Sequence, residues 1–264
     1  MARAYPTILL STVLLEPNRW TPQKLPTFAV STWAPAVCDA GFSGLELWEN
    51  HAALADTTEQ QALCHLPLPI TVLNSYCTFD DAGTAGRRVA TKLIRSYGVS
   101  GVKFNFGNDS TLIGTYQRHL EAWADELPAS CRLLCECHAG TVLERPDAAA
   151  RILWPFAGRV EVIVHPFSGE RATLQHWIER FGPAVTHAHV AARQGDSAFV
   201  TLEDVSTEAC ARIGILRAAG FDGTWSIEFT KGVARSPEDR QDLLLRAAAD
   251  MAFIRGQLSG GTAC

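Results

Sequence analysis

The stretch Ala219-Gly220-Phe221-Asp222-Gly223-Thr224-Trp225-Ser226-Ile227-Glu228 passes from a helical pattern through two glycines into an apolar run. Its first half has a close copy near the start of the chain, Ala40-Gly41-Phe42-Ser43-Gly44, which also leads into an apolar run. A glycine just past the last helical residue suits a left-handed helix cap. The two copies therefore predict the same helix-to-strand connection, used once early and once late in the chain.

Around these copies, short apolar runs alternate with longer helical patterns. Eight runs in 264 residues give about 33 residues per unit, which fits the roughly 30 residues of a strand–helix–strand step. An open doubly wound sheet is the alternative, but no G-x-G-x-x-G or G-x-x-x-x-G-K sequence supports it. We expect an α/β protein, a single (β/α)8 TIM barrel over residues 1–264. The predicted strands are Ile8–Leu15, Leu45–Trp48, Ile70–Tyr76, Gly101–Phe106, Arg132–Cys137, Val160–His165, Val185–Val190 and Trp225–Phe229.

Helical patterns fill the gaps between the predicted strands. The last helix is expected to start at Ser236-Pro237-Glu238-Asp239, because serine caps helices, proline suits the first helical position and acids suit the first turn. The predicted helices are Ala34–Ala40, Thr58–Cys64, Gly83–Ser96, Leu112–Glu126, Pro146–Trp154, Leu174–Phe181, Glu203–Ala219 and Pro237–Leu258.

Composition narrows the class of protein. Hydrophobic residues make up 47% and charged residues 19%, which excludes a disordered or fibrous chain. The formal net charge of −5 disfavours nucleic acid as a partner, since such proteins usually carry a basic face. No apolar run reaches the roughly 18 residues of a membrane span, so no membrane partner is expected.

The eight cysteines indicate whether the protein works in a reducing or an oxidising cellular compartment. The chain is long, no C-x-x-C sequence occurs, and several cysteines lie inside apolar runs. We interpret them as free, buried thiols of a cytoplasmic protein. Cys135 and Cys137 flank Glu136, and strand alternation places both on the opposite face from that carboxylate. They are therefore expected to be unpaired and away from any site that Glu136 helps to form.

Four consecutive predicted strands end in a potential metal ligand. These residues are Glu136, His165, His189 and Glu228. Because the carboxyl ends of barrel strands meet at one mouth, we expect the four side chains to converge there. Two carboxylates and two imidazoles suit one divalent ion such as Mn²⁺, Co²⁺, Zn²⁺ or Fe²⁺. His187 lies two residues before His189 and is expected deeper in the barrel, behind the ligands.

Other polar residues near the strand ends are candidates for binding substrate. Asn105 near the mouth is expected to bind a substrate hydroxyl, and His138 follows the fifth strand directly. Arg193 and Lys231 lie in the loops after the seventh and eighth strands, which often form anion sites in such barrels. Solvated charges at the rim are the alternative for both.

Two buried charges of the early strands are given a structural role. Glu46 lies within a predicted strand, and we interpret it as a buried carboxylate paired with a neighbour such as Lys103.

The sequence resembles the xylose isomerase-like TIM-barrel superfamily of sugar phosphate isomerases and epimerases. The resemblance covers nearly the whole chain. Its motifs are Ala40-Gly41-Phe42-Ser43-Gly44-Leu45-Glu46-Leu47-Trp48, Cys135-Glu136-Cys137-His138-Ala139-Gly140-Thr141, His187-Ala188-His189, and the stretch from Ala219 to Glu228.

The resemblance implies a ligand set and a role for two glutamates. Glu136, His189 and Glu228 match family metal ligands, whereas the usual Asp-Pro of the sixth strand is His165-Pro166 in this chain. In the family the two glutamates also transfer protons, which implies the same for Glu136 and Glu228. A homodimer or homotetramer is expected by the same analogy.

The function expected from these observations is metal-dependent isomerisation or epimerisation of a sugar, sugar phosphate or related polyol through an enediolate, in carbohydrate metabolism. A dehydratase similar to inosose dehydratase is one alternative, since it starts from the same kind of intermediate. A non-catalytic barrel with a degraded metal site is another, because the second anionic ligand is missing. An endonuclease is disfavoured because it needs more metal ligands and a basic surface.

Overall fold

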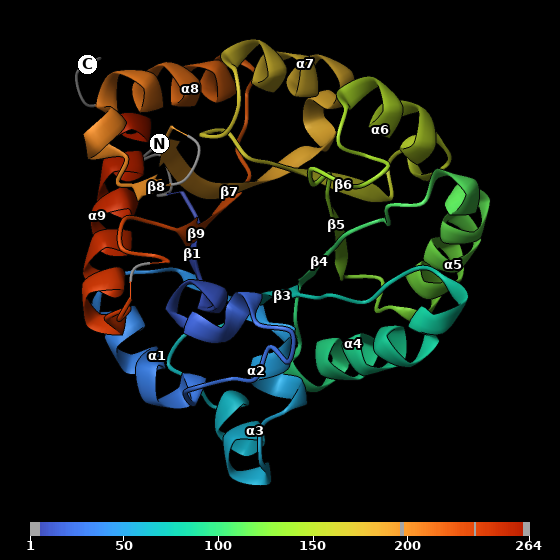
Figure 1. Cartoon of the computed structure of the whole chain (residues 1–264), viewed down its shortest axis with the longest axis horizontal. Coiled ribbons are helices and arrows are strands. Elements are labelled where there is room, and N and C mark those ends of the chain that lie inside the picture. The colour runs from blue at the N-terminus through green and yellow to red at the C-terminus, as the bar shows by residue number, and fades with distance from the viewer. Residues whose placement is uncertain (1–5, 196–197, 235, 261–264) are drawn as a thin grey trace.

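The predicted (β/α)8 barrel is confirmed by the computed structural model, which describes residues 6–195, 198–234 and 236–260. Parallel strands pair in sequence order from β1 to β6, β7 pairs with β6, and β9 closes the ring between β7 and β1. Helices surround this ring on the outside (Figure 1). The parallel barrel strands are β1 Ile8–Ser11, β2 Gly44–Trp48, β3 Ile70–Asn74, β4 Gly101–Phe104, β5 Arg132–Glu136, β6 Val160–Val164, β7 Val185–Gln194 and β9 Thr224–Phe229.

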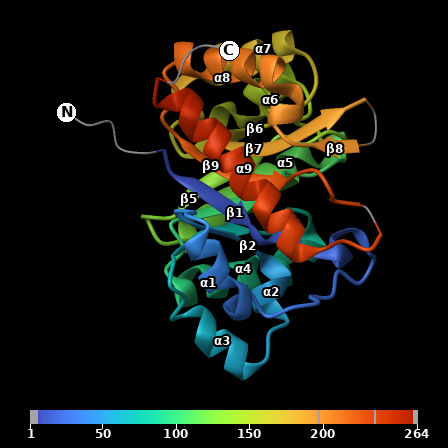
Figure 2. The ribbon, with the colours of Figure 1, turned by 90° about the vertical axis from the view of Figure 1, so that its left-hand side faces the viewer.

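The helices cover the outer face of the barrel, and α9 runs along it at a steep angle in the side view (Figure 2). Their bounds are α1 Val30–Asp39, α2 Glu49–Ala53, α3 Thr57–Leu63, α4 Thr84–Tyr97, α5 Ile113–Glu126, α6 Pro146–Leu153, α7 Arg171–Phe181, α8 Ser206–Ala218 and α9 Arg240–Leu258. Within the described residues no helix is long and apolar enough to cross a membrane.

The repeated loop has the same structural cause at both of its copies. Gly41 and Gly220 follow a helix with φ of 91° and 76°, a region that glycine adopts without strain. A Cβ on Gly223 would lie 2.1 Å from the Thr186 carbonyl oxygen, and one on Gly44 would lie 2.6 Å from Thr71 Oγ1. Each copy therefore needs one glycine to turn and a second to let the next strand join the barrel.

Several predicted boundaries are wrong. Strand β1 ends at Ser11, not at Leu15, because Thr12–Leu15 form a 3-10 helix. Helix α9 begins at Arg240, not near Pro237, because the cap is Asp239, whose carboxylate accepts hydrogen bonds from the backbone of Gln241 and Asp242. Strand β7 runs four residues past its predicted end at Val190 and pairs antiparallel with a short strand β8, Ala198–Val200. This extension carries Arg193 out of the barrel wall and brings Phe199 over the mouth.

The inside of the barrel changes from apolar to polar toward the mouth. Leu9, Val72, Leu134 and Ile163 form a small buried cluster of their own, separate from the large cluster between strands and helices. Buried polar and charged residues lie on the strands beyond this apolar layer. This apolar cluster forms the floor of the barrel interior and excludes water from one side of the polar residues. The lower local dielectric strengthens the electrostatic interactions among them.

The prediction of free thiols throughout is wrong at one described cysteine. Of the described cysteines six are free, but Cys210 in α8 is disulfide-bonded. Only Cys77 and Cys135 of the six free thiols are buried, so the expected burial is also wrong for the other four. Cys264 lies outside the described residues.

Asp250 of α9 gives the stability of the fold a pH dependence. Burial raises its pKa to about 6, although it accepts hydrogen bonds from the Leu202 backbone and the Thr230 hydroxyl. Because this pKa is higher in the folded than in the unfolded chain, stability falls as pH rises through 6. Asp250→Asn should stabilise the fold at pH 8 by up to about 3 kcal/mol, and by less at pH 5. Urea unfolding at the two pH values tests this, and an equal or negative change at pH 8 would contradict it.

Candidate metal centre

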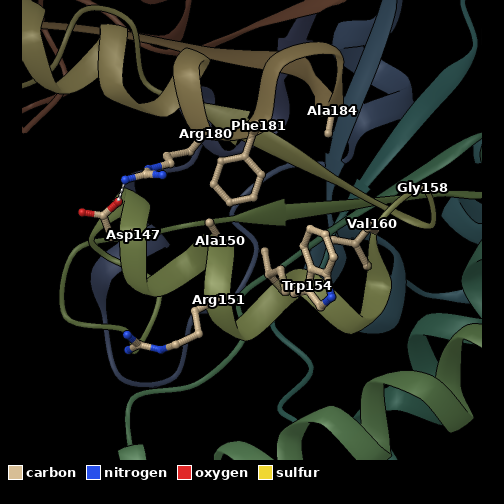
Figure 3. Close-up of a pocket in the computed structure, with 11 residues that line it drawn as sticks. Asp147, Ala150, Arg151, Trp154, Gly158, Val160, Arg180, Phe181 and Ala184 are labelled. Atoms are coloured by element: carbon tan, nitrogen blue, oxygen red, sulfur yellow. Dashed lines mark ion pairs between the residues drawn. The ribbon is translucent and has the colours of Figure 1, made fainter.

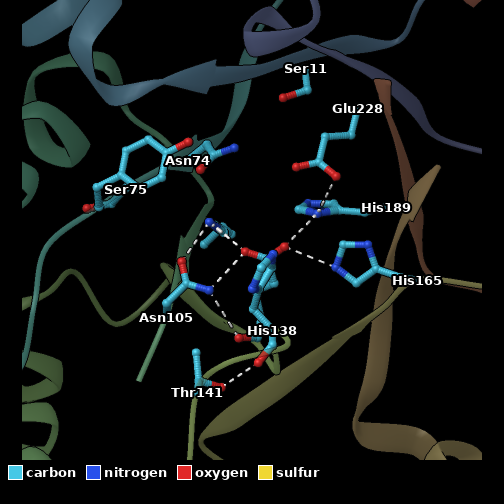
Figure 4. Close-up of polar contacts among 12 residues, drawn as sticks. Ser11, Asn74, Ser75, Asn105, His138, Thr141, His165, His189 and Glu228 are labelled. Carbon is cyan, nitrogen blue, oxygen red and sulfur yellow. Dashed lines mark hydrogen bonds and ion pairs between the residues drawn. The ribbon is translucent and has the colours of Figure 1, made fainter. Parts of the chain in front are cut away.

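The four predicted ligands come together at the mouth of the barrel. Glu136 ends β5, His165 follows β6, and His189 and Glu228 lie on β7 and β9. One ligand atom from each residue lies within 4.8 Å of those of the other three. Figure 4 shows His165, His189 and Glu228 directed toward one another. The strands fix this convergence, because each side chain is carried by a different strand of a closed ring.

His189 presents an unpartnered nitrogen to this centre. Its Nε2 lies 3.1 Å from Glu46 Oε2, a distance at which the ring N–H donates to the carboxylate. Its Nδ1 is buried and has no hydrogen-bond partner among the described residues, but lies 3.6 Å from both Glu136 Oε1 and Glu228 Oε2. A metal-binding histidine usually donates the N–H of one ring nitrogen to a carboxylate, which leaves the other ring nitrogen deprotonated and able to bind the ion.

The surrounding carboxylates also make this nitrogen basic. Burial alone would lower the pKa of His189, but Glu46, Glu228 and Glu136 raise it well above its ordinary value. Either a proton or a metal ion would satisfy the negative charge around Nδ1, so metal binding is expected to release a proton.

The two carboxylate oxygens of Glu136 have different neighbours: one contacts side chains of β4 and the residue after it, and the other faces the metal centre. Oε2 accepts from Lys103 Nζ at 2.7 Å and from Asn105 Nδ2 at 3.0 Å. Oε1 faces His165 Nε2 at 3.0 Å. Burial would raise the pKa of Glu136, but the Lys103 ammonium and the His165 hydrogen bond hold it well below its usual range. Glu136 is therefore a fixed anion with one oxygen left for an ion.

Glu228 is less constrained than Glu136. Within the described part of the chain its carboxylate makes no hydrogen bond, and His189 Nδ1 at 3.6 Å is its ion-pair neighbour. Burial raises the pKa of Glu228, and the nearby Glu136 adds to this rise against the opposing effect of His189. A carboxyl group with a raised pKa is suited to accept and return a proton near neutral pH.

The predicted pairing of Glu46 with Lys103 is wrong. Glu46 accepts from Ser11 and Asn74 through Oε1 and lies against His187 and His189 through Oε2. Because Lys103 lies nearer the mouth, its partners are Glu136 and Asn105. His187 lies behind His189, as predicted, with Nε2 3.2 Å from Glu46.

A cavity of about 470 Å³ opens over the centre. It is lined by three of the four candidate ligands, Glu136, His165 and Glu228, and by aromatic side chains that include Phe199 and Phe229. A larger hollow of about 890 Å³ lies elsewhere, between α6 and α7 (Figure 3). It contains none of the ligands, and Asp147 and Arg180 at its edge are paired with each other. The candidate metal-binding residues therefore line the smaller cavity.

The predicted substrate-binding residues separate into two groups. His138 and Arg193 line the cavity, with the Arg193 guanidinium carbon 4.0 Å from the centre of the Phe199 ring. Asn105 and Lys231 are not among the residues that line it. Asn105 is bonded to Glu136, and Lys231 Nζ is paired with Asp204 at 3.0 Å.

The two thiols beside Glu136 differ. Cys135 is buried and free, as predicted. Cys137 is free but only partly buried, and it lines the cavity because β5 ends at Glu136 and alternation stops there. The prediction that both thiols are buried is therefore wrong for Cys137.

The donor set fits a divalent ion. Two carboxylates and two imidazoles suit borderline metals, and the unpartnered His189 Nδ1 marks the place that an ion would fill. A second cluster of Glu46, His187 and His189 also has donor atoms close together. Its contacts are those of a hydrogen-bonded support behind His189, as the distances of 3.1 and 3.2 Å show.

His165 offers a direct test of this centre. His165→Ala should weaken Co²⁺ or Zn²⁺ binding about 10- to 100-fold, because one donor is lost and Glu136 Oε1 loses its neighbour. His165→Asp should retain binding and shift preference toward Mn²⁺, since a carboxylate is a harder ligand. Competition with a chelator measures both constants. An alanine variant with unchanged affinity would remove His165 from the centre.

Comparisons with known proteins support the fold. No protein-family model matches the chain, and no curated protein matches it. Among solved structures, 3-keto-D-glucoside 4-epimerase from E. coli is 13% identical with a TM-score of 0.65, covering 94% of this chain and 99% of that one. A probable 3-DHS dehydratase from Bacillus anthracis is 14% identical with a TM-score of 0.63, covering 93% and 97%.

Endonuclease IV from Thermus thermophilus is a further structural neighbour. It is 12% identical with a TM-score of 0.59, and the match covers 84% of this chain and 94% of that one. Two further neighbours are described as a putative xylose isomerase and a xylose isomerase domain protein, so the structural neighbours include xylose isomerase-like TIM-barrel proteins. Most of the neighbours named are enzymes. At such identities the similarity establishes the fold that this chain shares with them.

Proposed function

We propose that this chain is a metal-dependent isomerase or epimerase of a sugar, sugar phosphate or related polyol. One observation carries the proposal: four candidate ligand atoms converge under an open cavity, and one of them, His189 Nδ1, is buried with no hydrogen-bond partner in the described part of the chain. Glu136, His165, His189 and Glu228 would hold the ion. Its chemistry in such a site is Lewis acidity toward adjacent substrate oxygens, which lowers the cost of negative charge on them.

Glu228 is the proposed base. It lies under the cavity, has a raised pKa and forms no hydrogen bond within the described residues that would hold its proton-accepting oxygens. It would take a proton from a carbon next to a substrate carbonyl and, in an isomerase, return it to the neighbouring carbon on the same face. In an epimerase, a second group such as Glu136 would have to deliver a proton to the opposite face. Glu136 is the second proposed catalytic group, but its ion pair with Lys103 favours the charged form that a ligand needs.

A dehydratase is the second candidate, because a structural neighbour is described as a dehydratase and the first proton abstraction would be the same. Turnover of a panel of ketoses, sugar phosphates and cyclic polyols in deuterated water, followed by NMR, distinguishes the two. Exchange with solvent without loss of water supports the isomerase or epimerase, whereas loss of water supports the dehydratase. A protein that binds no divalent metal and turns over no member of the panel would contradict both and favour a non-catalytic barrel.

A further inference from the structure

Two ammonium groups approach one aromatic ring at the mouth of the barrel. Tyr76 follows the end of β3 by two residues, so its ring lies on the same side of the barrel as the ligands. Lys24 Nζ lies 3.9 Å from the centre of that ring and Lys103 Nζ lies 5.0 Å from it. Two positive charges this close to one ring repel each other, and a nearby negative charge offsets that repulsion.

Lys103 has such a partner and Lys24 does not. Lys103 Nζ is 2.7 Å from Glu136 Oε2. In residues 6–195, 198–234 and 236–260, no carboxylate lies within ion-pair distance of Lys24 Nζ, whose side chain is only partly exposed. One half-buried ammonium at the mouth therefore lacks a counter-ion.

The backbone holds Lys24 in this place. Its φ is 47°, and only one other described non-glycine residue, Ala234, has a positive φ. The Lys24 N–H donates to the Thr21 carbonyl at 3.2 Å, and the Lys24 carbonyl accepts from Asn50 Nδ2 at 2.8 Å. A non-glycine residue in this region carries a conformational cost, and such residues gather where a side chain must be presented for function.

Tyr76 is held from the other side and remains open to solvent. Glu49 Oε2 accepts from the Tyr76 N–H at 2.8 Å and from the Ser75 hydroxyl at 2.6 Å. The Tyr76 side chain is nevertheless 39% exposed. Lys103 Nζ lies 5.0 Å from the centre of this ring and 2.7 Å from Glu136 Oε2, so this place adjoins the metal centre. Burial raises the pKa of the Tyr76 phenol, and Glu228 and Glu136 add to that rise.

We propose that Lys24 and Tyr76, with the buried Lys103 behind them, form a subsite for an anionic oxygen group of the substrate, a carboxylate or a phosphate. This inference rests on the proposed function, because it places the substrate's charged group beside the part that the metal centre would bind. An anion there would supply the counter-ion that Lys24 lacks, and Tyr76 would offer its hydroxyl as a hydrogen-bond donor. The substrate class is then a sugar acid or sugar phosphate, in preference to a neutral sugar.

Three six-carbon probes test the subsite. D-sorbitol is neutral, D-gluconate carries a carboxylate and sorbitol 6-phosphate carries a phosphate on a similar chain. Calorimetry on the Co²⁺-loaded protein should show at least one anionic probe binding about 10- to 100-fold more tightly than sorbitol. Lys24→Gln should abolish this preference, whereas Lys92→Gln, an exposed lysine of α4, should keep it. The probe that loses more affinity in Lys24→Gln identifies carboxylate or phosphate.

Two results would overturn the subsite while leaving the metal centre in place. One is sorbitol binding as tightly as both anionic probes, or no binding of either anion. The other is an anion preference that survives in Lys24→Gln, which would assign the charge recognition to the ion itself. Failure of the protein to bind Co²⁺ would instead contradict the proposed function, and the same titrations on metal-free protein would then decide the anion preference on its own.

Discussion

Glu228→Gln is expected to lower turnover by roughly 10²- to 10⁴-fold while the barrel stays folded. The amide keeps the size of the carboxylate and can weakly bind an ion, but it cannot accept a proton. Because Glu228 makes no hydrogen bond within the described residues, the substitution breaks no structural contact of that kind. Steady-state kinetics on the substrate found by the panel, together with circular dichroism, measure the two parts of this prediction.

Glu203→Gln is a matched control for Glu228→Gln, since Glu203 is an exposed carboxylate next to the start of α8. Its turnover should equal that of the unmodified protein. Near-normal turnover of Glu228→Gln would remove Glu228 from the chemistry, and unfolding of that variant would show a structural role that its contacts do not indicate.

Lys103→Met is expected to destabilise the metal-free protein by about 3–5 kcal/mol. Methionine fills a similar volume, but it leaves the Glu136 carboxylate buried without the ammonium at 2.7 Å. The cost should shrink in the metal-loaded protein, since a bound divalent ion supplies positive charge to the same carboxylate. Urea unfolding with and without Co²⁺ measures both values.

Lys92→Met serves as the control for Lys103→Met, because Lys92 lies exposed on α4 and should cost little. A loss below about 1 kcal/mol in metal-free Lys103→Met would show that the pair contributes little. An identical loss with and without Co²⁺ would argue that Glu136 does not face the ion.

The ring of strands and the convergence of the four candidate ligands could be predicted because both depend on local patterns. Apolar runs that recur about every 33 residues define the barrel. A polar residue at the end of such a run must lie at the mouth, so Glu136, His165, His189 and Glu228 could be recognised without knowing the partner of any of them.

The contacts behind the ligands could not be predicted, since they depend on how the strands are staggered. Glu46 on β2 reaches His189 across the barrel from β7, a contact between residues 143 positions apart. Lys103 is in register with Leu134 of the adjacent strand, and its long side chain reaches Glu136 two residues nearer the mouth. The position of Lys24 depends on a left-handed backbone at a lysine, for which the sequence carries no signal.

Anomalous X-ray diffraction on crystals grown with Co²⁺, recorded on both sides of the cobalt edge, tests the metal centre most directly. We expect one strong peak bonded to His189 Nδ1 and His165 Nε2, with oxygens of Glu136 and Glu228 completing the protein ligands at about 2.0–2.2 Å, as for similar divalent ions. No peak within bonding distance of His189 Nδ1, at saturating Co²⁺ and neutral pH, would contradict it.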